Sequence, residues 1–308
     1  TGNIEKKKAA QILKILQDKK QNINEDIAII GIDAQLPVVQ DDIAEYWYNV
    51  KNRIDFITKL PESRKTDVQK YLEYIQLSEE EDIDYIEGGF LPEVDKFDYK
   101  LFRMTPKEAK MMDPFQRIFL QVAWNTIEDA GYGGKKLNNS KTGVYVGFAS
   151  NIKDSYARMI LNTNQDSLLT GGLGNITAML PSRISYLLNL KGPSMVIDTA
   201  CSSALLSVHK ACQAINSGEC DTAIAGALRI NLLPYDAEYL RFGNESSDYR
   251  TRTFDYNSDG AGVGEGILAV MLKPLKQAMK DRDNIYGVIK GSAANQDGTT
   301  IGLTAPNP

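Results

Sequence analysis

The chain has 308 residues, of which 43% are hydrophobic and 24% are charged, a composition typical of a folded globular protein and not of a disordered one. Its net charge of −5 argues against nucleic acid and anionic membrane surfaces as partners. The sequence has no apolar run long enough for a transmembrane helix, and its start lacks the apolar core of a signal peptide. We therefore expect a cytoplasmic protein with a substantial core.

The first third of the chain predicts a linker followed by the first strand. Residues 1–24 are rich in Lys, Gln and Asn, with apolar residues at helical spacing, and predict an amphipathic linker helix. Residues 26–31 are apolar and β-branched and end at a glycine, which is typical of a strand buried on both faces. Residues 40–92 are polar and irregular, so we expect surface helices and loops there, without chemistry.

Two helix starts follow. Thr105, followed by a proline and then by Glu108, forms a capping box. Asp113 and Pro114 repeat the pairing of a cap with a proline, an apolar stripe at helical spacing follows, and Gly131 supplies a left-handed stop. A helix is therefore predicted from Pro114 to about Gly131.

The remaining chain alternates strands with helices. Helices are predicted at 175–188 and 201–217, and strands at 143–147, 195–198, 223–227 and 267–272. Such alternation favours a mixed, largely parallel sheet covered by helices on both faces.

Cys201 stands where a predicted buried strand turns directly into a helix. At a helix N-terminus, unpaired backbone N–H groups and the positive end of the helix dipole favour a thiolate and can stabilise an oxyanion. Cys201 is therefore a candidate nucleophile. The alternative is a small residue that fills a tight corner, because free cysteines are among the most buried residues.

The other cysteines and the single histidine predict structural roles. Three cysteines are too few for a disulfide framework or a four-cysteine zinc site, and no metal site is expected. Cys212 lies inside the predicted helix and Cys220 in the turn after it, so both are expected in the core. His209 lies eight residues beyond Cys201, about 12 Å along a helix, too far to act as its base.

Two further motifs fail on inspection. Asp255, Asn257 and Asp259 begin a calcium-loop pattern, but its twelfth position is Gly266 where a bidentate glutamate is needed, so a polar turn is expected. The glycines at 260, 262 and 264 do not complete a dinucleotide fingerprint, because Glu265 occupies the sixth position.

The segment Asp198–Ser203, followed by Leu205, Val208 and His209, resembles the active-site region of β-ketoacyl synthase domains in modular polyketide synthases. The resemblance runs from about residue 25 to the end of the chain. Its further landmarks, in order, are Gly88–Phe90, Asp95, Phe97–Asp98, Met112–Pro114, Gln116–Arg117, Glu128–Gly131, Ser217–Asp221, Arg252–Asp255, Asp259–Gly260, Gly264–Gly266, Asn295–Gly298 and Gly302–Asn307.

The resemblance implies an α/β thiolase-like fold of two similar halves, each a mixed five-stranded sheet with covering helices. It divides the chain into a linker or docking helix at 1–24, an N-terminal half at 25–280, and the start of a C-terminal half at 281–308. The two catalytic histidines of this family belong to the C-terminal half and are absent, so we expect these residues to be a piece of a larger domain.

The implied activity is acyl transfer followed by carbon–carbon bond formation. Cys201 would accept an acyl chain from an acyl carrier protein, and a malonyl-type unit would then be decarboxylated and condensed with it. Substrate-binding positions would be Asn175, Met179, Thr199 and Ala200. No tightly bound cofactor is implied, since the carrier protein delivers the phosphopantetheine arm.

The resemblance also implies partners and a setting. They are the acyl carrier protein, neighbouring modules of a multifunctional enzyme of antibiotic biosynthesis, and a second copy that pairs through a strand at about 192–198. Residues near Arg64, Asp113 and Asn175 look closest to ketosynthases served by an acyltransferase in trans. Two other functions stay open: an acyltransferase of the same fold that does not condense, and a non-catalytic docking platform for carrier protein.

Overall fold

The computed structural model describes residues 25–37, 43–75, 83–149, 156–163, 173–234 and 245–302, together with Ala305 and Asn307. The predicted linker helix at 1–24 lies outside these residues. No helix within the described ranges is long and apolar enough to cross a membrane.

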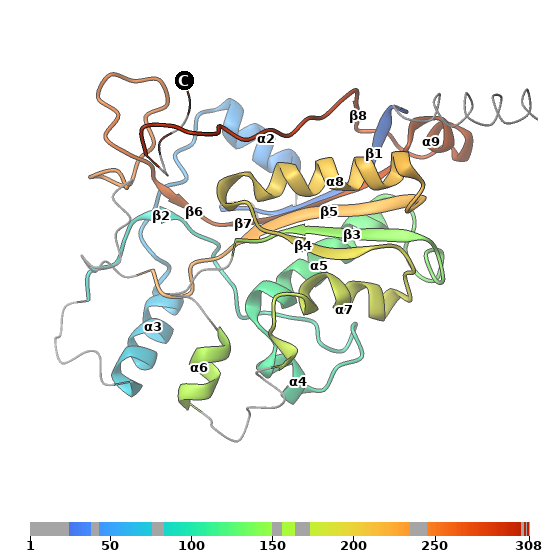
Figure 1. Ribbon diagram of the computed structural model, residues 1–308. Coiled ribbons are helices and arrows are strands. Elements are labelled where there is room, and N and C mark those ends of the chain that lie inside the picture. The colour runs from blue at the N-terminus through green and yellow to red at the C-terminus, as the bar shows by residue number, and fades with distance from the viewer. Residues whose placement is uncertain are drawn as a thin grey trace, which may run out of the picture.

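A mixed six-stranded sheet organises the molecule (Figure 1). In spatial order its strands are β4 (Ser194–Ile197), β3 (Thr142–Gly147), β5 (Thr222–Arg229), β7 (Gly266–Pro274), β1 (Ile27–Gln35) and β8 (Gly287–Ile289). The short strand β8 extends the expected five strands to six. The strands predicted at 26–31, 143–147, 195–198, 223–227 and 267–272 are confirmed within a few residues.

The expectation of a largely parallel sheet is wrong. β3 pairs in parallel with β4 and β5, but the β5–β7, β7–β1 and β1–β8 pairings are antiparallel. The reason is that β7 begins beside the residue at which β5 ends. It therefore runs back alongside β5 in the opposite direction, and no crossover helix is needed.

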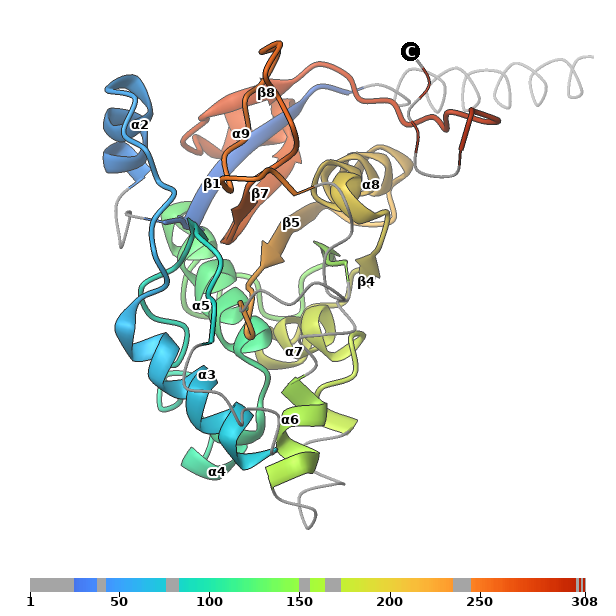
Figure 2. The same ribbon diagram turned by 90° about the vertical axis from the view of Figure 1, so that its left-hand side faces the viewer.

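Helices cover both faces of the sheet, as predicted. Figures 1 and 2 place α8 (Ser203–Ser217) on one face and α5 (Pro114–Asp129) and α7 (Met179–Leu188) on the other. Successive side chains of β5 point to opposite faces, so Ile224 joins the core cluster under α5 while Ala223 and Ala225 join the one under α8. Both faces are apolar for this reason.

The predicted helix starts are confirmed. The Thr105 side chain caps α4 (Pro106–Met111) through a complete capping box, and Asp113 caps α5 by accepting a 2.9 Å hydrogen bond from the Phe115 N–H. Gly131, with φ +76°, follows the end of α5. The helix predicted from 175 begins instead at Met179, because the side chain of Asn175 is hydrogen-bonded to the segment before α5.

The remaining elements lie at the two ends of the strands. They are α2 (Ile43–Lys51), α3 (Glu62–Tyr74), α6 (Tyr156–Thr163), α9 (Leu275–Asp281) and the two-residue parallel pair of β2 (Gly88–Gly89) with β6 (Val263–Gly264). Of these, α9 lies directly after the end of β7, and α3 lies beside its start. The described parts of 40–92 form helices and loops, as expected, but not only at the surface: they include the buried strand β2, and Arg64, Phe90 and Leu91 are buried.

Candidate active site at the turn between β4 and α8

Cys201 lies in a tight turn at the edge of the sheet where β3, β4 and β5 end. After β4, residues Ala200–Ser202 form a single turn of 3-10 helix that continues directly into α8. The Cys201 side chain is exposed there. The predicted position of this thiol at a helix start is therefore confirmed, and the alternative of a buried corner residue is wrong.

Side chains within the turn hold its backbone in place. The Thr199 N–H donates to Ser203 Oγ at 2.8 Å, and that hydroxyl donates to the Ala200 carbonyl at 2.7 Å. Asp198 Oδ1 accepts from the Ala200 N–H at 3.1 Å, and Ser202 Oγ donates to the Thr199 carbonyl at 2.8 Å. These bonds leave the turn few ways to relax.

Ala200 has a strained backbone. Its φ of +53° lies in the left-handed region, which costs a residue with a Cβ about 1–2 kcal/mol. Such strain persists only where neighbouring bonds over-determine the conformation, and it is concentrated at functional sites. The strained residue directly precedes Cys201.

Close packing of α8 on β3 also positions the turn. A Cβ on Gly147, the last residue of β3, would lie 2.5 Å from the Ser203 carbonyl oxygen and 2.8 Å from the Ala204 nitrogen. Only glycine therefore lets the first turn of α8 approach the strand this closely. The requirement links β3 to the geometry around Cys201.

The arrangement can support nucleophilic chemistry. The Cys201 N–H makes no hydrogen bond to any residue that the structure describes, and it stands at the positive end of the fifteen-residue helix α8. Such N–H groups can stabilise an oxyanion. The turn thus brings together a candidate nucleophile and a candidate oxyanion donor.

The other two thiols are confirmed in the core. Cys212 and Cys220 are 4% and 1% exposed, and burial raises the pKa of each thiol to about 11. Both are therefore protonated near neutral pH and inaccessible to a substrate. Cys201 is the exposed thiol of the chain.

His209 has the structural role predicted for it. It is 9% exposed, and its Nδ1 lies 2.8 Å from Ser292 Oγ. It lies about two helical turns beyond Cys201, and its side chain connects α8 to the segment that follows β8. The predicted polar turn at Asp259 is also present, since this carboxylate accepts hydrogen bonds from Ser246 and Ser247.

The residues expected to bind substrate fall into two groups. Thr199 and Ala200 adjoin Cys201 and are exposed. Asn175 instead accepts from the Asp113 N–H at 2.8 Å and donates to the Met111 carbonyl at 2.7 Å, so its amide secures the chain before α7. Met179 begins α7 and is 36% exposed.

A buried ion pair near the same edge was not expected from the sequence. Arg64 of α3 contacts Glu265 at 2.6 and 2.9 Å and donates to the carbonyls of Leu91 and Asn231. Glu265 also accepts from the backbone N–H groups of Leu91 and Asn231 at 2.8 Å. The pair therefore fastens α3 and the chain after β5 to the start of β7. Both residues lie in segments that carry the family resemblance, near Arg64 and at Gly264–Gly266, but nothing in the sequence indicated that they pair.

A second polar cluster lies at the other end of β7. Lys273, at the end of β7, lies 2.6 Å from Asp281 and 2.7 Å from Asp283 and also contacts Tyr132. Burial lowers the pKa of Lys273, but these three hydrogen bonds outweigh it and hold the pKa above its ordinary value. The lysine stays charged, and the cluster is structural.

The chain matches known proteins along most of its length. Residues 24–278 match the family described as "Beta-ketoacyl synthase, N-terminal domain". Polyketide synthase PksL of Bacillus subtilis (strain 168) is 39% identical over 95% of this chain, and the 6-methylsalicylic acid synthase of Penicillium terrestre is 39% identical over 94%.

Solved structures of ketosynthases are also similar to this chain. A ketosynthase from module 6 of the bacillaene synthase from Bacillus subtilis 168 superposes with a TM-score of 0.77 at 39% identity, over 92% of this chain and 46% of that one. This chain spans 7% and 16% of the two curated relatives named above. The fold is thus the thiolase fold of ketosynthases, and the chain belongs to the β-ketoacyl synthase family, among the ketosynthases of polyketide synthases.

Proposed function

We propose that Cys201 is the residue that takes the acyl chain during polyketide synthesis. The observation that carries this proposal is an exposed thiol on a strained turn at the start of α8, in a chain whose other thiols are buried. The thiolate attacks the carbonyl of an acyl thioester borne on the phosphopantetheine arm of a carrier protein. A new carbon–sulfur bond forms, the oxyanion is stabilised by the Cys201 N–H, the bond from the carbonyl carbon to the sulfur of the arm breaks, and the arm leaves as a thiolate.

Condensation is the second proposed step. A malonyl-type unit on carrier protein loses carbon dioxide, the resulting carbanion attacks the Cys201 thioester, and the cysteine thiolate is released. This step needs donors that stabilise an enolate. His209 is hydrogen-bonded to Ser292. We therefore expect the C-terminal half of the complete domain to supply the donors that stabilise the enolate.

The proposed substrate contacts follow from the same turn. Thr199 and Ala200 flank the thiol, and we place them at the mouth of the acyl site. For Asn175 we propose a positioning role that secures the start of α7, because both ends of its amide are bonded to the 111–113 segment. Two points remain predictions from the resemblance. They are a substrate contact by Met179 and an acyltransferase that serves this ketosynthase in trans.

Acyl loading tests the nucleophile directly. The complete ketosynthase domain is incubated with an acyl phosphopantetheine thioester, and its intact mass is measured. We expect one added acyl group, retained in Cys212→Ala and lost in Cys201→Ala. Equal loading of Cys201→Ala would refute the assignment. Adding malonyl carrier protein then distinguishes condensation, which yields a β-ketoacyl product, from transfer alone.

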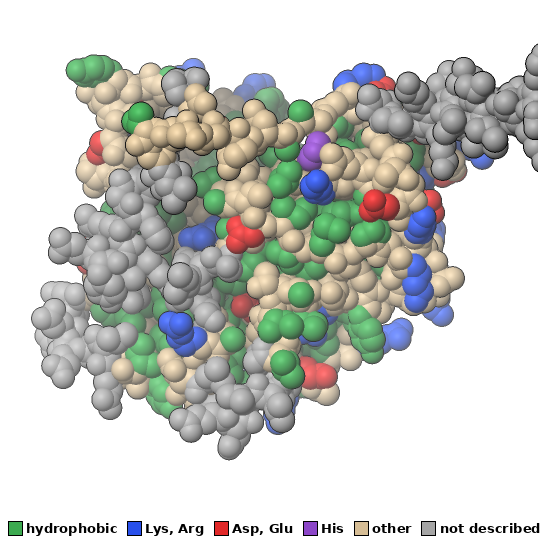
Figure 3. Space-filling model, in the orientation of Figure 1, with side chains coloured by type: hydrophobic (Ala, Val, Ile, Leu, Met, Phe, Trp, Pro, Cys, Tyr) green, Lys and Arg blue, Asp and Glu red, His purple; other side chains and the backbone are tan. Residues whose placement is uncertain are grey.

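We also propose a homodimer through β4. This strand forms the outer edge of the sheet beyond β3, and its Met195 is 39% exposed. Figure 3 shows hydrophobic side chains exposed across the middle of the face that it draws. Leu205 of α8 and Tyr186 of α7 are 80% and 85% exposed. An edge strand and an apolar surface together favour a two-fold interface. A complete domain that light scattering finds monomeric at micromolar concentration would refute it.

A further inference from the structure

An apolar groove lies on the face of the sheet opposite α8. It is bounded by α5, α7, the loop at 101–103 and the turn at 134–138, and it encloses about 640 Å³. Phe102, Leu120 and Ile184 form its buried floor, and Trp124, Leu187 and Leu188 form half-buried walls. This volume falls within the range of small-molecule sites.

The groove is separate from the Cys201 turn. It lies beside the residues that lead into β3 and beside the last turn of α7, whereas Cys201 follows the opposite ends of β3 and β4. A ligand in the groove would therefore not compete directly with a chain on Cys201.

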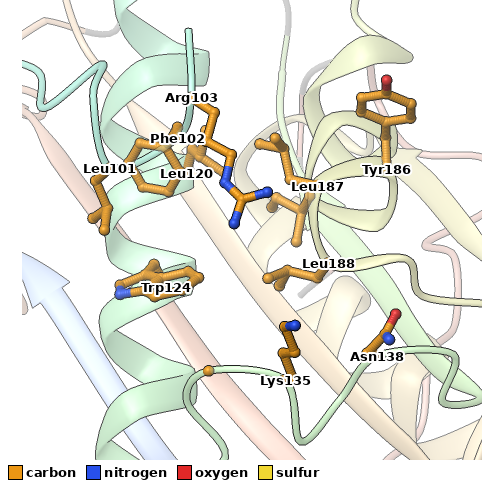
Figure 4. A pocket seen from close by; sticks show the side chains of 12 residues that line it. Leu101, Phe102, Arg103, Leu120, Trp124, Lys135, Asn138, Tyr186, Leu187 and Leu188 are labelled. Carbon is orange, nitrogen blue, oxygen red and sulfur yellow. The ribbon is translucent and has the colours of Figure 1, made fainter.

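Two cations stand over this apolar surface. Figure 4 shows the Arg103 guanidinium reaching the middle of the groove, between Trp124 on one side and Leu187 on the other, with the Lys135 ammonium directed toward it from below. Both residues are exposed. Neither side chain has a hydrogen bond or ion pair with any described residue, and no carboxylate lines the groove.

The local charge is unusual for this chain. The whole sequence carries a net charge of −5, yet the charged side chains that line the groove are an arginine and a lysine. The Arg103 backbone is held by a bond from its N–H to the Lys100 carbonyl at 3.0 Å, and Asp98 caps the same turn through the Leu101 N–H. The guanidinium is thereby presented to the groove.

We propose that this groove binds a long-chain carboxylate. The alkyl chain would lie along Trp124, Leu187 and Leu188, where it removes apolar surface from water. The carboxylate would lie between Arg103 and Lys135, where a planar guanidinium can donate two parallel hydrogen bonds. A neutral chain would leave both cations unpaired, and a short acid would leave the apolar walls exposed to water. The proposal does not depend on the function of Cys201.

Photoaffinity labelling tests the site and its ligand class. The complete domain is irradiated with a decanoic acid that carries a diazirine on its chain, and labelled peptides are identified by mass spectrometry. We expect label on the peptides that contain Trp124 or Leu187. Decanoate should compete for it, while decanol and acetate should compete at least several-fold less well.

Charge variants complete the test. Arg103→Ala and Lys135→Ala each remove one exposed cation and should weaken decanoate binding about three- to tenfold, as expected for partly exposed charge pairs. Lys107→Ala removes an exposed cation from α4, outside the groove, and should leave binding unchanged. Absence of label from the groove, equal competition by decanol, or equal effects of all three variants would overturn the proposal.

Discussion

Removing the guanidinium of Arg64 should be among the most destabilising single changes in this chain. The Arg64 and Glu265 side chains are 7% and 0% exposed, and the arginine makes four hydrogen bonds at 2.6–3.2 Å. Arg64→Ala leaves the Glu265 carboxylate buried with only the two backbone N–H donors of Leu91 and Asn231. Breaking a buried pair in this way costs about 3–5 kcal/mol.

A neighbouring residue provides a matched control. Lys65 lies one position along α3, and its 3.3 Å ion pair joins a half-buried ammonium to the exposed carboxylate of Glu62. Lys65→Ala should therefore lower the free energy of unfolding by about 1 kcal/mol or less. The double change of Arg64 and Glu265 to Met removes both charges but leaves two N–H groups without an acceptor. We therefore expect its free energy of unfolding to lie between those of Arg64→Ala and Lys65→Ala.

Urea unfolding of the complete domain, followed by circular dichroism, measures these differences. With a denaturant dependence of about 3 kcal/mol per molar urea, Arg64→Ala should lower the midpoint by about 1 M or more. Equal midpoints for Arg64→Ala and Lys65→Ala would refute the reasoning, because a buried charge without its partner would then cost no more than a surface pair.

Three further predictions concern the cysteines and the strained turn. Iodoacetamide at pH 8 should modify Cys201 in the folded domain and spare Cys212 and Cys220; peptide mass spectrometry that finds equal modification would contradict their burial. Burial raises the Cys220 pKa from 9.0 to about 11, so its contribution to stability is fully present below pH 9 and is lost as pH rises through about 11. Cys220→Ala should therefore flatten the alkaline loss of stability seen in urea midpoints between those pH values, and an unchanged slope would exclude this cause. Ala200→Gly should raise the free energy of unfolding by about 1 kcal/mol, because glycine adopts φ +53° without strain, and a lowered midpoint would argue against stored strain.

Local signals predicted the elements well because each depends on neighbours in the sequence. The box at Thr105 and Glu108 and the cap at Asp113 are complete within four residues, so both helix starts were predictable. The direction of β7 was not, since it depends on which edge of the sheet the chain enters after leaving β5. A strand has the same alternation of side chains in either direction.

The ion pair of Arg64 and Glu265 illustrates the other limit. Its partners are 201 positions apart, and each stands in a segment whose polar character is typical of surface loops. Only the folded chain shows that α3 closes over the start of β7 and removes both charges from water. A charged residue in a polar segment carries no signal of burial, which is why residues 40–92 were expected to hold no chemistry.

The Cys201 turn lies between these cases. Its hydrogen bonds all join residues within Asp198–Ser203, so the segment specifies most of its own geometry, and the thiol could be identified from the sequence. The turn also requires the close approach of α8 to Gly147, a residue fifty-four positions before Cys201. That approach follows from the parallel pairing of β3 with β4. A candidate nucleophile can therefore be located from the sequence where its turn is local, whereas the groups that would complete the proposed reaction depend on segments brought together only by the fold.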